Sequence, residues 1–135
     1  MPVTLRSRAG RRAGRFLLLE VMNIRRVGPG IMLAPRADPS DGWLDVVAVA
    51  ARERERLTDI LERCLAVRPP RPFLRSQKVR RIRLAVQGGE FRLDDRILLP
   101  RGRAAAAPAR IDIEVQPGAI ELLLPGPGPA TRRPA

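Results

Sequence analysis

Glycine and proline turns cut most of this chain into short apolar segments, and this punctuation constrains the fold more than any other feature. The stretch VGPG at 27–30 cannot propagate regular structure, and Pro35 stops the apolar run that follows it. Short segments rich in β-compatible residues between such turns predict strands. We expect strands at 16–24, 31–34 and 43–50, the last an almost unbroken apolar run typical of a buried strand.

A period of two returns in the second half of the chain. In VRRIRLAV (79–86), apolar residues alternate with polar ones except at the Arg80–Arg81 pair, a slip that predicts a β-bulge. The two glycines at 88–89 then predict a hairpin between this strand and FRLDD (91–95). A last hairpin is predicted for RIDIEV at 110–115 and AIELLL at 119–124.

One segment, about 52–67, has helical periodicity. Its apolar residues recur at spacings of three and four and therefore share one face, formed by Leu57, Ile60, Leu61, Cys64 and Leu65. We expect this face to be buried and the helix to end before PPRP, because proline lacks the amide proton that a helix needs. The fold class predicted is mostly β (α+β): an antiparallel two-sheet β-sandwich-like domain with one amphipathic helix.

The length of 135 residues predicts a single domain with one core. Residues 1–15 are basic, contain glycine and show no periodic pattern, so we expect a flexible basic arm there. The ordered domain is expected at 16–125. The composition of residues 126–135 predicts a disordered tail.

Several kinds of site are excluded by composition. The chain has no histidine, which removes Ser-His and Cys-His catalysis and every His-ligated metal site. Cys64 is the single cysteine, so no disulfide forms within the chain, and we expect a buried inert thiol. No segment approaches the ~20 apolar residues of a membrane span, and FLLLEVM lacks signal-peptide features. We therefore predict a cytoplasmic protein.

The formal net charge is +12, and Lys78 is the only lysine among the 26 basic residues. One interpretation is an anionic partner, which would be nucleic acid, membrane head groups or nucleotide phosphate. The other is that the arginines, which are spread along the whole chain, mostly solvate the surface. Composition leaves both interpretations open.

The loop PRADPSDGWLD carries three aspartates, Asp38, Asp41 and Asp45, within eight residues. Turn chemistry explains Asp41-Gly42, because glycine takes positive φ without strain and aspartate bonds its own backbone. A divalent cation is the alternative, since Mg²⁺ and Ca²⁺ bind carboxylate and carbonyl oxygens from tight loops.

The run VMNIRRVGPGIMLAPRADPSDGWLDVVAV resembles the opening of the second domain of bacterial diacylglycerol kinase-like lipid kinases, relatives of sphingosine kinase. That pattern has an Asn after a strand, a glycine cluster, a strand ending in Ala-Pro, and a loop of Asp-Gly, any residue, Leu-Asp. The matching positions here are Asn23, Gly28, Gly30, Ala34-Pro35, Asp41-Gly42 and Leu44-Asp45. The later elements also follow the order of that family, as far as about residue 125.

This resemblance implies a β-sandwich-like domain that supplies part of a lipid site, and a structural Mg²⁺ on the Asp-Gly loop. Its implied ligands are the Asp41 carboxylate and backbone carbonyls near Asp38 and Trp43. The implied reaction transfers the γ-phosphoryl of ATP to a lipid hydroxyl. The implied partners are a membrane lipid or its head group and an ATP-binding domain, upstream or on a separate chain.

Two departures from the family pattern matter. The Gly-Gly-Asp-Gly-Thr phosphate loop of the first domain does not occur in this sequence, so no ATP site is expected in this chain alone. The acidic segment of the family, Asp-Gly-Glu, matches Asp94, Asp95 and Arg96, and arginine cannot accept the proton of the lipid hydroxyl. Asp94 or Asp95 therefore remains as the candidate catalytic base; a register that uses Glu90 spoils the following strand.

The function predicted is the substrate-side (C-terminal) domain of a lipid kinase, inactive alone and peripheral to the membrane. A non-catalytic protein that binds anionic lipid is an alternative, favoured by Arg96. A basic nucleic-acid-binding protein is another, disfavoured because Phe and Trp are few and Tyr is absent.

Overall fold

The computed structural model describes residues 2–28, 31–65, 74–88, 90–94, 96–99 and 107–121. Strands dominate these ranges: β1 (Pro2–Ser7), β2 (Gly10–Met22), β3 (Arg26–Val27), β4 (Ile31–Met32), β5 (Leu44–Ala50), β6 (Ser76–Val79), β7 (Arg81–Val86), β8 (Phe91–Leu93), β9 (Arg96–Leu99) and β10 (Ala109–Glu114). A 3₁₀ turn, η1 (Ala51–Glu53), leads into the helix α1 (Arg54–Leu65). No helix in the described ranges is long and apolar enough to cross a membrane.

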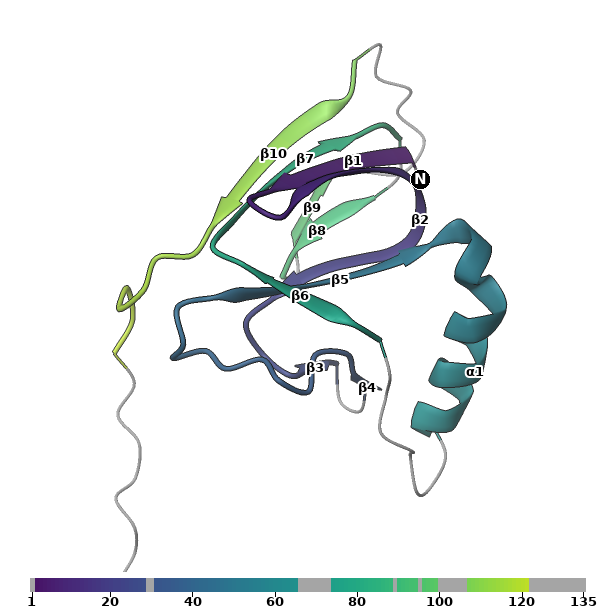
Figure 1. Cartoon of the computed structure of the whole chain (residues 1–135), viewed down its shortest axis with the longest axis horizontal. Helices are drawn as coiled ribbons and strands as arrows, with labels where there is room; N and C mark the ends of the chain where they lie inside the picture. The colour runs from purple at the N-terminus through teal and green to yellow at the C-terminus, as the bar shows by residue number, and fades with distance from the viewer. Residues whose placement is uncertain are drawn as a thin grey trace, which may run out of the picture.

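Six strands form one antiparallel sheet in the order β10-β7-β1-β2-β5-β6. In this order β6 lies at one edge and β7 next to the other, although Arg80 alone separates them in sequence. The sheet must therefore fold over, and the long strand β2, with a register shift between Phe16 and Leu18, passes from one half to the other. Figure 1 shows the two halves as layers. The predicted β-sandwich-like fold class is confirmed.

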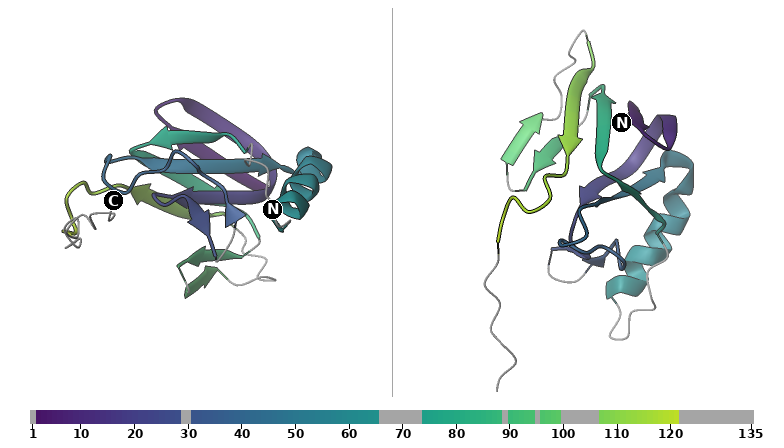
Figure 2. Two further views of the ribbon diagram at one scale, coloured as in Figure 1. Left: turned by 90° about the horizontal axis from the view of Figure 1, so that it is seen from below. Right: turned by 60° about the vertical axis from the view of Figure 1, so that its left-hand side comes forward.

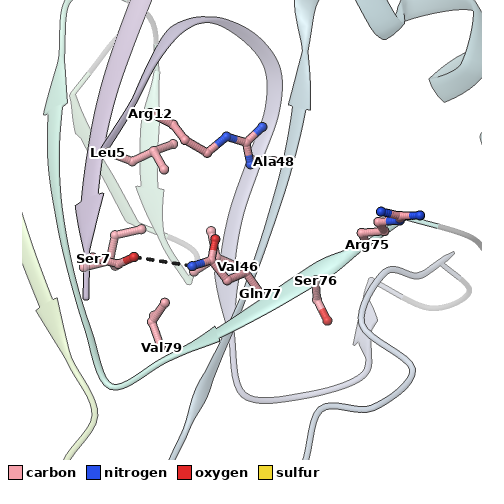
Figure 3. Close-up of a pocket in the computed structure, with 10 residues that line it drawn as sticks. Leu5, Ser7, Arg12, Val46, Ala48, Arg75, Ser76, Gln77 and Val79 are labelled. Carbon is pink, nitrogen blue, oxygen red and sulfur yellow. Dashed lines mark hydrogen bonds between the residues drawn. The ribbon is translucent and has the colours of Figure 1, made fainter. Parts of the chain in front are cut away.

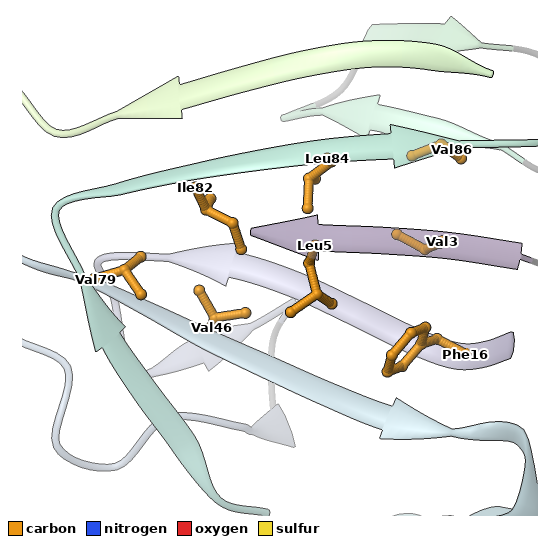
Figure 4. Close-up of a cluster of buried hydrophobic side chains, with 8 residues drawn as sticks. All are labelled: Val3, Leu5, Phe16, Val46, Val79, Ile82, Leu84 and Val86. Carbon is orange, nitrogen blue, oxygen red and sulfur yellow. The ribbon is translucent and has the colours of Figure 1, made fainter. Parts of the chain in front are cut away.

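The inner core lies between the two halves of the sheet (Figure 4). Alternate residues of β1 and β7 point into it, so the period of two seen in the sequence becomes one buried face. The buried members are Val3, Leu5, Phe16, Val46, Val79, Ile82, Leu84 and Val86. Phe91 of the separate β8–β9 hairpin packs against this cluster from outside the six-stranded sheet.

A second core covers the opposite face of β5. Its buried residues are Met22, Leu33, Ala34, Ala37, Val47, Val49, Ile60 and Leu74, contributed by α1, by the segment around β4 and by the sheet. Val46 faces the inner core while Val47 and Val49 face this one, so β5 is buried on both sides. Burial on both faces explains the unbroken apolar run that predicted this strand.

The predicted helix exists, and α1 lies inside the expected limits of 52–67. At the start of the preceding turn η1, the Ala50 amide donates to a Glu53 carboxylate oxygen at 3.0 Å, which satisfies one otherwise free backbone donor. Of the predicted face, Ile60 is buried, while Leu57 and Leu61 are half-buried. The side chains of Cys64 and Leu65 lie outside the described part of the chain.

The prediction of a flexible arm at residues 1–15 is wrong. β1 pairs along its whole length with the start of β2, and on its other edge with β7, which makes it an interior strand of the sheet. Val3 and Leu5 are 3% and 4% exposed. The many arginines of this segment face outward and concealed the alternation of its apolar residues.

Two pairing predictions are also wrong. The slip at Arg80–Arg81 is a corner between two strands. Before it, β6 pairs with β5, and after it, β7 pairs with β1. The predicted pairing of FRLDD with β7 does not form, because both edges of β7 are taken by β1 and β10, and β8 pairs with β9 instead.

β10 is the edge strand next to β7, and the right-hand view of Figure 2 shows the β8–β9 hairpin beside it. The predicted strand at 110–115 corresponds to β10, but its partner is β7. Residues 116–121 contain no strand, and 122–124 lie outside the described residues, as does the predicted tail at 126–135.

Candidate functional site

The aspartate loop, residues 38–45, is held by turn hydrogen bonds. Asp38 Oδ1 accepts from the Ser40 amide at 2.9 Å and from Ser40 Oγ at 2.6 Å, and these bonds lower the pKa of Asp38 below its ordinary value. The Asp41 amide donates to the Asp38 carbonyl at 3.3 Å, and Asp41 Oδ1 accepts from the Trp43 amide at 2.9 Å. The turn chemistry predicted from Asp41-Gly42 is present in full.

Gly42 is required by its conformation. Its φ is +71°, a region that side chains with a Cβ rarely adopt, and an added Cβ would lie 3.4 Å from Pro117 Cγ. The loop therefore depends both on the glycine and on the C-terminal segment that packs against it.

Lys78, on β6, provides the cation for this loop. Its ammonium pairs with Asp41 Oδ2 and lies 3.5 Å from Asp45 Oδ2. The hydrogen bond from Lys78 lowers the pKa of Asp41, and the same bond raises the pKa of Lys78. Lys78 lies directly opposite Asp45 in the pairing of β5 with β6, so strand register brings these charges together.

Asp45 is the one charged side chain among the buried residues of the described chain, with 0% exposure. Its Oδ1 accepts a hydrogen bond from Ser76 Oγ at 2.7 Å. Its Oδ2 accepts no hydrogen bond from a described residue, and the ammonium of Lys78 is its ion-pair partner. A buried carboxylate of this kind needs a cation, because burial strongly disfavours an unpaired charge.

The predicted magnesium ligands do not fit a resident ion in this arrangement. Both oxygens of the Asp41 carboxylate have partners, Trp43 N–H and the Lys78 ammonium, and the carbonyl of Asp38 already accepts from the Asp41 amide. In the described ranges no group of three or more His, Cys, Asp or Glu side chains is placed to hold a metal. Magnesium on this loop stays a prediction that these residues do not favour, because Lys78 already lies between the acidic side chains.

Of the two candidate catalytic bases, the structure describes Asp94, which follows β8 directly. Asp94 is exposed, with a φ of +50°, and Arg96 is exposed at the start of β9. Asp95 lies outside the described residues. No hydrogen bond or ion pair among the described residues joins Asp94 to the aspartate loop.

Two hollows flank the end of the β1–β2 hairpin. The smaller, about 210 Å³, has a floor of core residues, including Leu5 and Val46, and Arg12 and Arg75 at its rim (Figure 3). A hydrogen bond of 3.4 Å from Gln77 Nε2 to Ser7 Oγ crosses it.

The larger hollow, which we call the arginine groove, measures about 810 Å³ and adjoins the aspartate loop. Its lining comes from the β1–β2 hairpin, the loop and the β6–β7 corner: Arg6, Ser7, Arg8, Ala9, Trp43, Lys78, Val79, Arg80, Arg81 and Arg83. Sequence reasoning missed this groove. The one available signal was Lys78, the single lysine in an arginine-rich chain.

Comparison with known families matches residues 3–124 to the family described as the YegS C-terminal NAD kinase beta sandwich-like domain. The chain belongs to this YegS C-terminal family. The match includes β1 and confirms the resemblance to the second domain of lipid kinases drawn from the sequence. Searches of curated proteins and of solved structures gave no match.

Membership of the YegS C-terminal family makes this chain a C-terminal domain of the lipid kinase type. The folded-over sheet agrees with the β-sandwich in the family's description. In this domain the candidate functional regions of the described surface are the aspartate loop, the start of the β8–β9 turn at Asp94 and the arginine groove.

Proposed function

We propose that this chain is the lipid-substrate side of an ATP-dependent lipid kinase that phosphorylates the hydroxyl of a diacylglycerol-like lipid. The observation that supports this most is the family match over residues 3–124. The sequence has no Gly-Gly-Asp-Gly-Thr phosphate loop, so the nucleotide would be held by an ATP-binding domain elsewhere. We place the protein in the cytoplasm, peripheral to the membrane, in keeping with its positive charge and its lipid substrate.

In the chemical step, the role proposed for this chain is to supply the base for the lipid hydroxyl. The lipid hydroxyl oxygen attacks the γ-phosphorus of ATP, the bond from that phosphorus to the ADP oxygen breaks, and the hydroxyl proton passes to a base. Asp94 is the described carboxylate at the family's acidic segment, and its exposure on a turn leaves it accessible to a substrate. Arg96 cannot take the proton, because a guanidinium has no free acceptor.

The isolated chain should transfer no phosphate from ATP to diacylglycerol in mixed micelles. Adding a separately expressed ATP-binding domain of a lipid kinase of this type should produce turnover, because that domain supplies the nucleotide site. Labelled phosphate in the lipid fraction measures the reaction, with the added domain alone as the control. Robust activity from the isolated chain would contradict the proposal.

In the reconstituted assay, Asp94→Asn should lower kcat by roughly 10²–10⁴-fold, the usual contribution of a general base. Arg96→Glu should raise kcat, since it places a second carboxylate at the position where the family has its glutamate. Asp59→Asn removes an exposed carboxylate on α1, where it pairs with Arg63, and serves as the control. An Asp94→Asn variant with unchanged kcat would remove Asp94 from the mechanism.

A non-catalytic lipid-binding protein is the second candidate, and Arg96 at the base position favours it. In that case the reconstituted mixture would be inactive while binding of anionic lipid persists. Nucleic-acid binding has less support, because the arginine groove offers a single aromatic ring, Trp43, on which bases could stack.

A further inference from the structure

The arginine groove has an unusual balance of charge. Six of its ten lining residues are Arg or Lys, and none is Asp or Glu. These six cations come from two separate stretches of chain, the β1–β2 hairpin and the β6–β7 corner, which the order of the sheet brings together. Like charges gathered at one hollow repel one another, so an anion bound there would relieve that repulsion.

Half of these cations are already neutralised by neighbours outside the groove. Arg81 Nε donates to Asp112 Oδ1 at 2.9 Å, and Arg83 Nε donates to Asp112 Oδ2 at 3.3 Å. Lys78 is held by the aspartate loop. Within the described chain, no carboxylate pairs with Arg6, Arg8 or Arg80.

Arg80 is nevertheless held in place. Its guanidinium lies over the ring of Trp43, 4.8 Å from the centroid, which orients the group without using its hydrogen-bond donors. An oriented guanidinium binds a phosphate through two parallel N–H···O bonds and loses less entropy than a free side chain would.

The groove also offers apolar surface. Trp43, Val79 and Ala9 contribute to its lining, and it shares Ser7 and Val79 with the smaller hollow, whose floor is Leu5, Val46 and Ile82. The two hollows therefore adjoin across the end of the β1–β2 hairpin. A ligand with a phosphate at one end and hydrocarbon at the other matches a cationic surface that lies next to an apolar one.

We propose that the arginine groove binds the phosphate group of an anionic amphiphile, with Arg6, Arg8 and Arg80 contacting the phosphate and Trp43 and Val79 contacting its apolar part. The ligand class is a phosphomonoester lipid, which is also the class of product that the proposed kinase reaction forms. The inference deepens the proposed function in that respect, but it concerns binding alone and needs neither ATP nor a partner domain.

The chain provides its own probe for this binding. Trp43 is the only tryptophan and the chain has no tyrosine, so intrinsic fluorescence reports directly on the groove. We would titrate the full chain with a short-chain phosphatidic acid below its micellar concentration. Parallel titrations use inorganic phosphate, the matching short-chain phosphatidylcholine, and a single-stranded oligonucleotide. Phosphatidic acid should bind most tightly, because it alone combines a dianionic phosphate with hydrocarbon.

Charge removal in the groove should weaken this binding. Arg6→Gln with Arg8→Gln should raise the Kd for phosphatidic acid about tenfold or more, the loss expected for charge-assisted hydrogen bonds. Arg52→Gln with Arg54→Gln removes the same net charge from exposed positions at the start of the helix and should leave the Kd within about twofold. Thermal melting of both double variants checks that each is folded.

Three results would overturn the proposal. An equal loss of affinity in both double variants would mean attraction by overall charge, without a site. If inorganic phosphate binds as tightly as phosphatidic acid, the hydrocarbon makes no contribution and the groove is a site for free phosphate. If the oligonucleotide binds more tightly than phosphatidic acid, the ligand class of the groove is nucleic acid and not lipid. A failed kinase assay with intact phosphatidic acid binding would contradict the proposed function and leave this inference standing.

Discussion

Leu5→Ala should lower the free energy of unfolding by about 2–5 kcal/mol, the range for removing a buried leucine side chain from a core. Leu5 is 4% exposed on an interior strand and packs in the inner core with Phe16 and Leu84. Its removal leaves a void between the two halves of the sheet. Denaturant unfolding followed by far-UV circular dichroism measures the loss.

Leu93→Ala is the matched control, because Leu93 is 57% exposed on β8 and has no place in either core. Its substitution should change stability by no more than about 0.5 kcal/mol. If Leu5→Ala were equally mild, residues 1–15 would be the flexible arm that their composition predicts. The comparison therefore tests the largest difference between the sequence analysis and the structure.

The elements that could be predicted are those whose local pattern is unambiguous. β5 could be predicted because both of its faces are buried, so nearly every residue between Leu44 and Ala50 is apolar. The helix is evident from spacings of three and four ending before prolines, and its observed start differs from the predicted one by two residues. Both signals depend on near neighbours in sequence.

The misassigned elements depend on distant neighbours. Residues 1–15 look like a polar arm because arginine dominates them, and only pairing with β7, some eighty residues away, buries Val3 and Leu5. The slip at Arg80–Arg81 is visible in the sequence, but a bulge and a corner between sheet halves produce the same local pattern. Which strand pairs with which is decided by long-range packing that periodicity does not encode.

The candidate site divides in the same way. The turn at Asp41-Gly42 could be predicted, because aspartate and glycine have strong local preferences. Its cation could not, since Lys78 lies 37 residues further along the chain and reaches Asp41 through the register of β6. The arginine groove combines residues 6–9, 43 and 78–83, and no local pattern connects them.

Lys78→Met should be among the most destabilising single substitutions on this surface. It keeps the length of the side chain and removes the ammonium, which leaves the Asp45 carboxylate buried with an uncompensated charge. Removing one partner of a buried pair costs far more than the pair itself contributes, because the remaining charge has lost its water as well as its partner. Thermal and denaturant unfolding of the variant measure the effect.

Two further variants separate charge from packing. Ser76→Ala removes the hydrogen bond that the uncharged Ser76 hydroxyl donates to Asp45 Oδ1 and should cost about 1–3 kcal/mol, less than the loss from Lys78→Met. The double variant Asp45→Asn with Lys78→Met should recover much of the lost stability, because it removes the unpaired charge along with its partner. A double variant no more stable than Lys78→Met alone would mean that the lysine acts through packing.

The same variants decide which cation the aspartate loop uses. Magnesium on the predicted Asp41 ligand would compete with the Lys78 ammonium for that carboxylate, so we expect a loop that already holds the ammonium to gain little from the ion. The wild-type melting temperature should be equal in excess magnesium and in EDTA, whereas Lys78→Met should melt higher in magnesium, because a ligand that binds the native state stabilises it. If EDTA lowers the melting temperature of the wild type, a metal is resident on the loop and the lysine does not replace it.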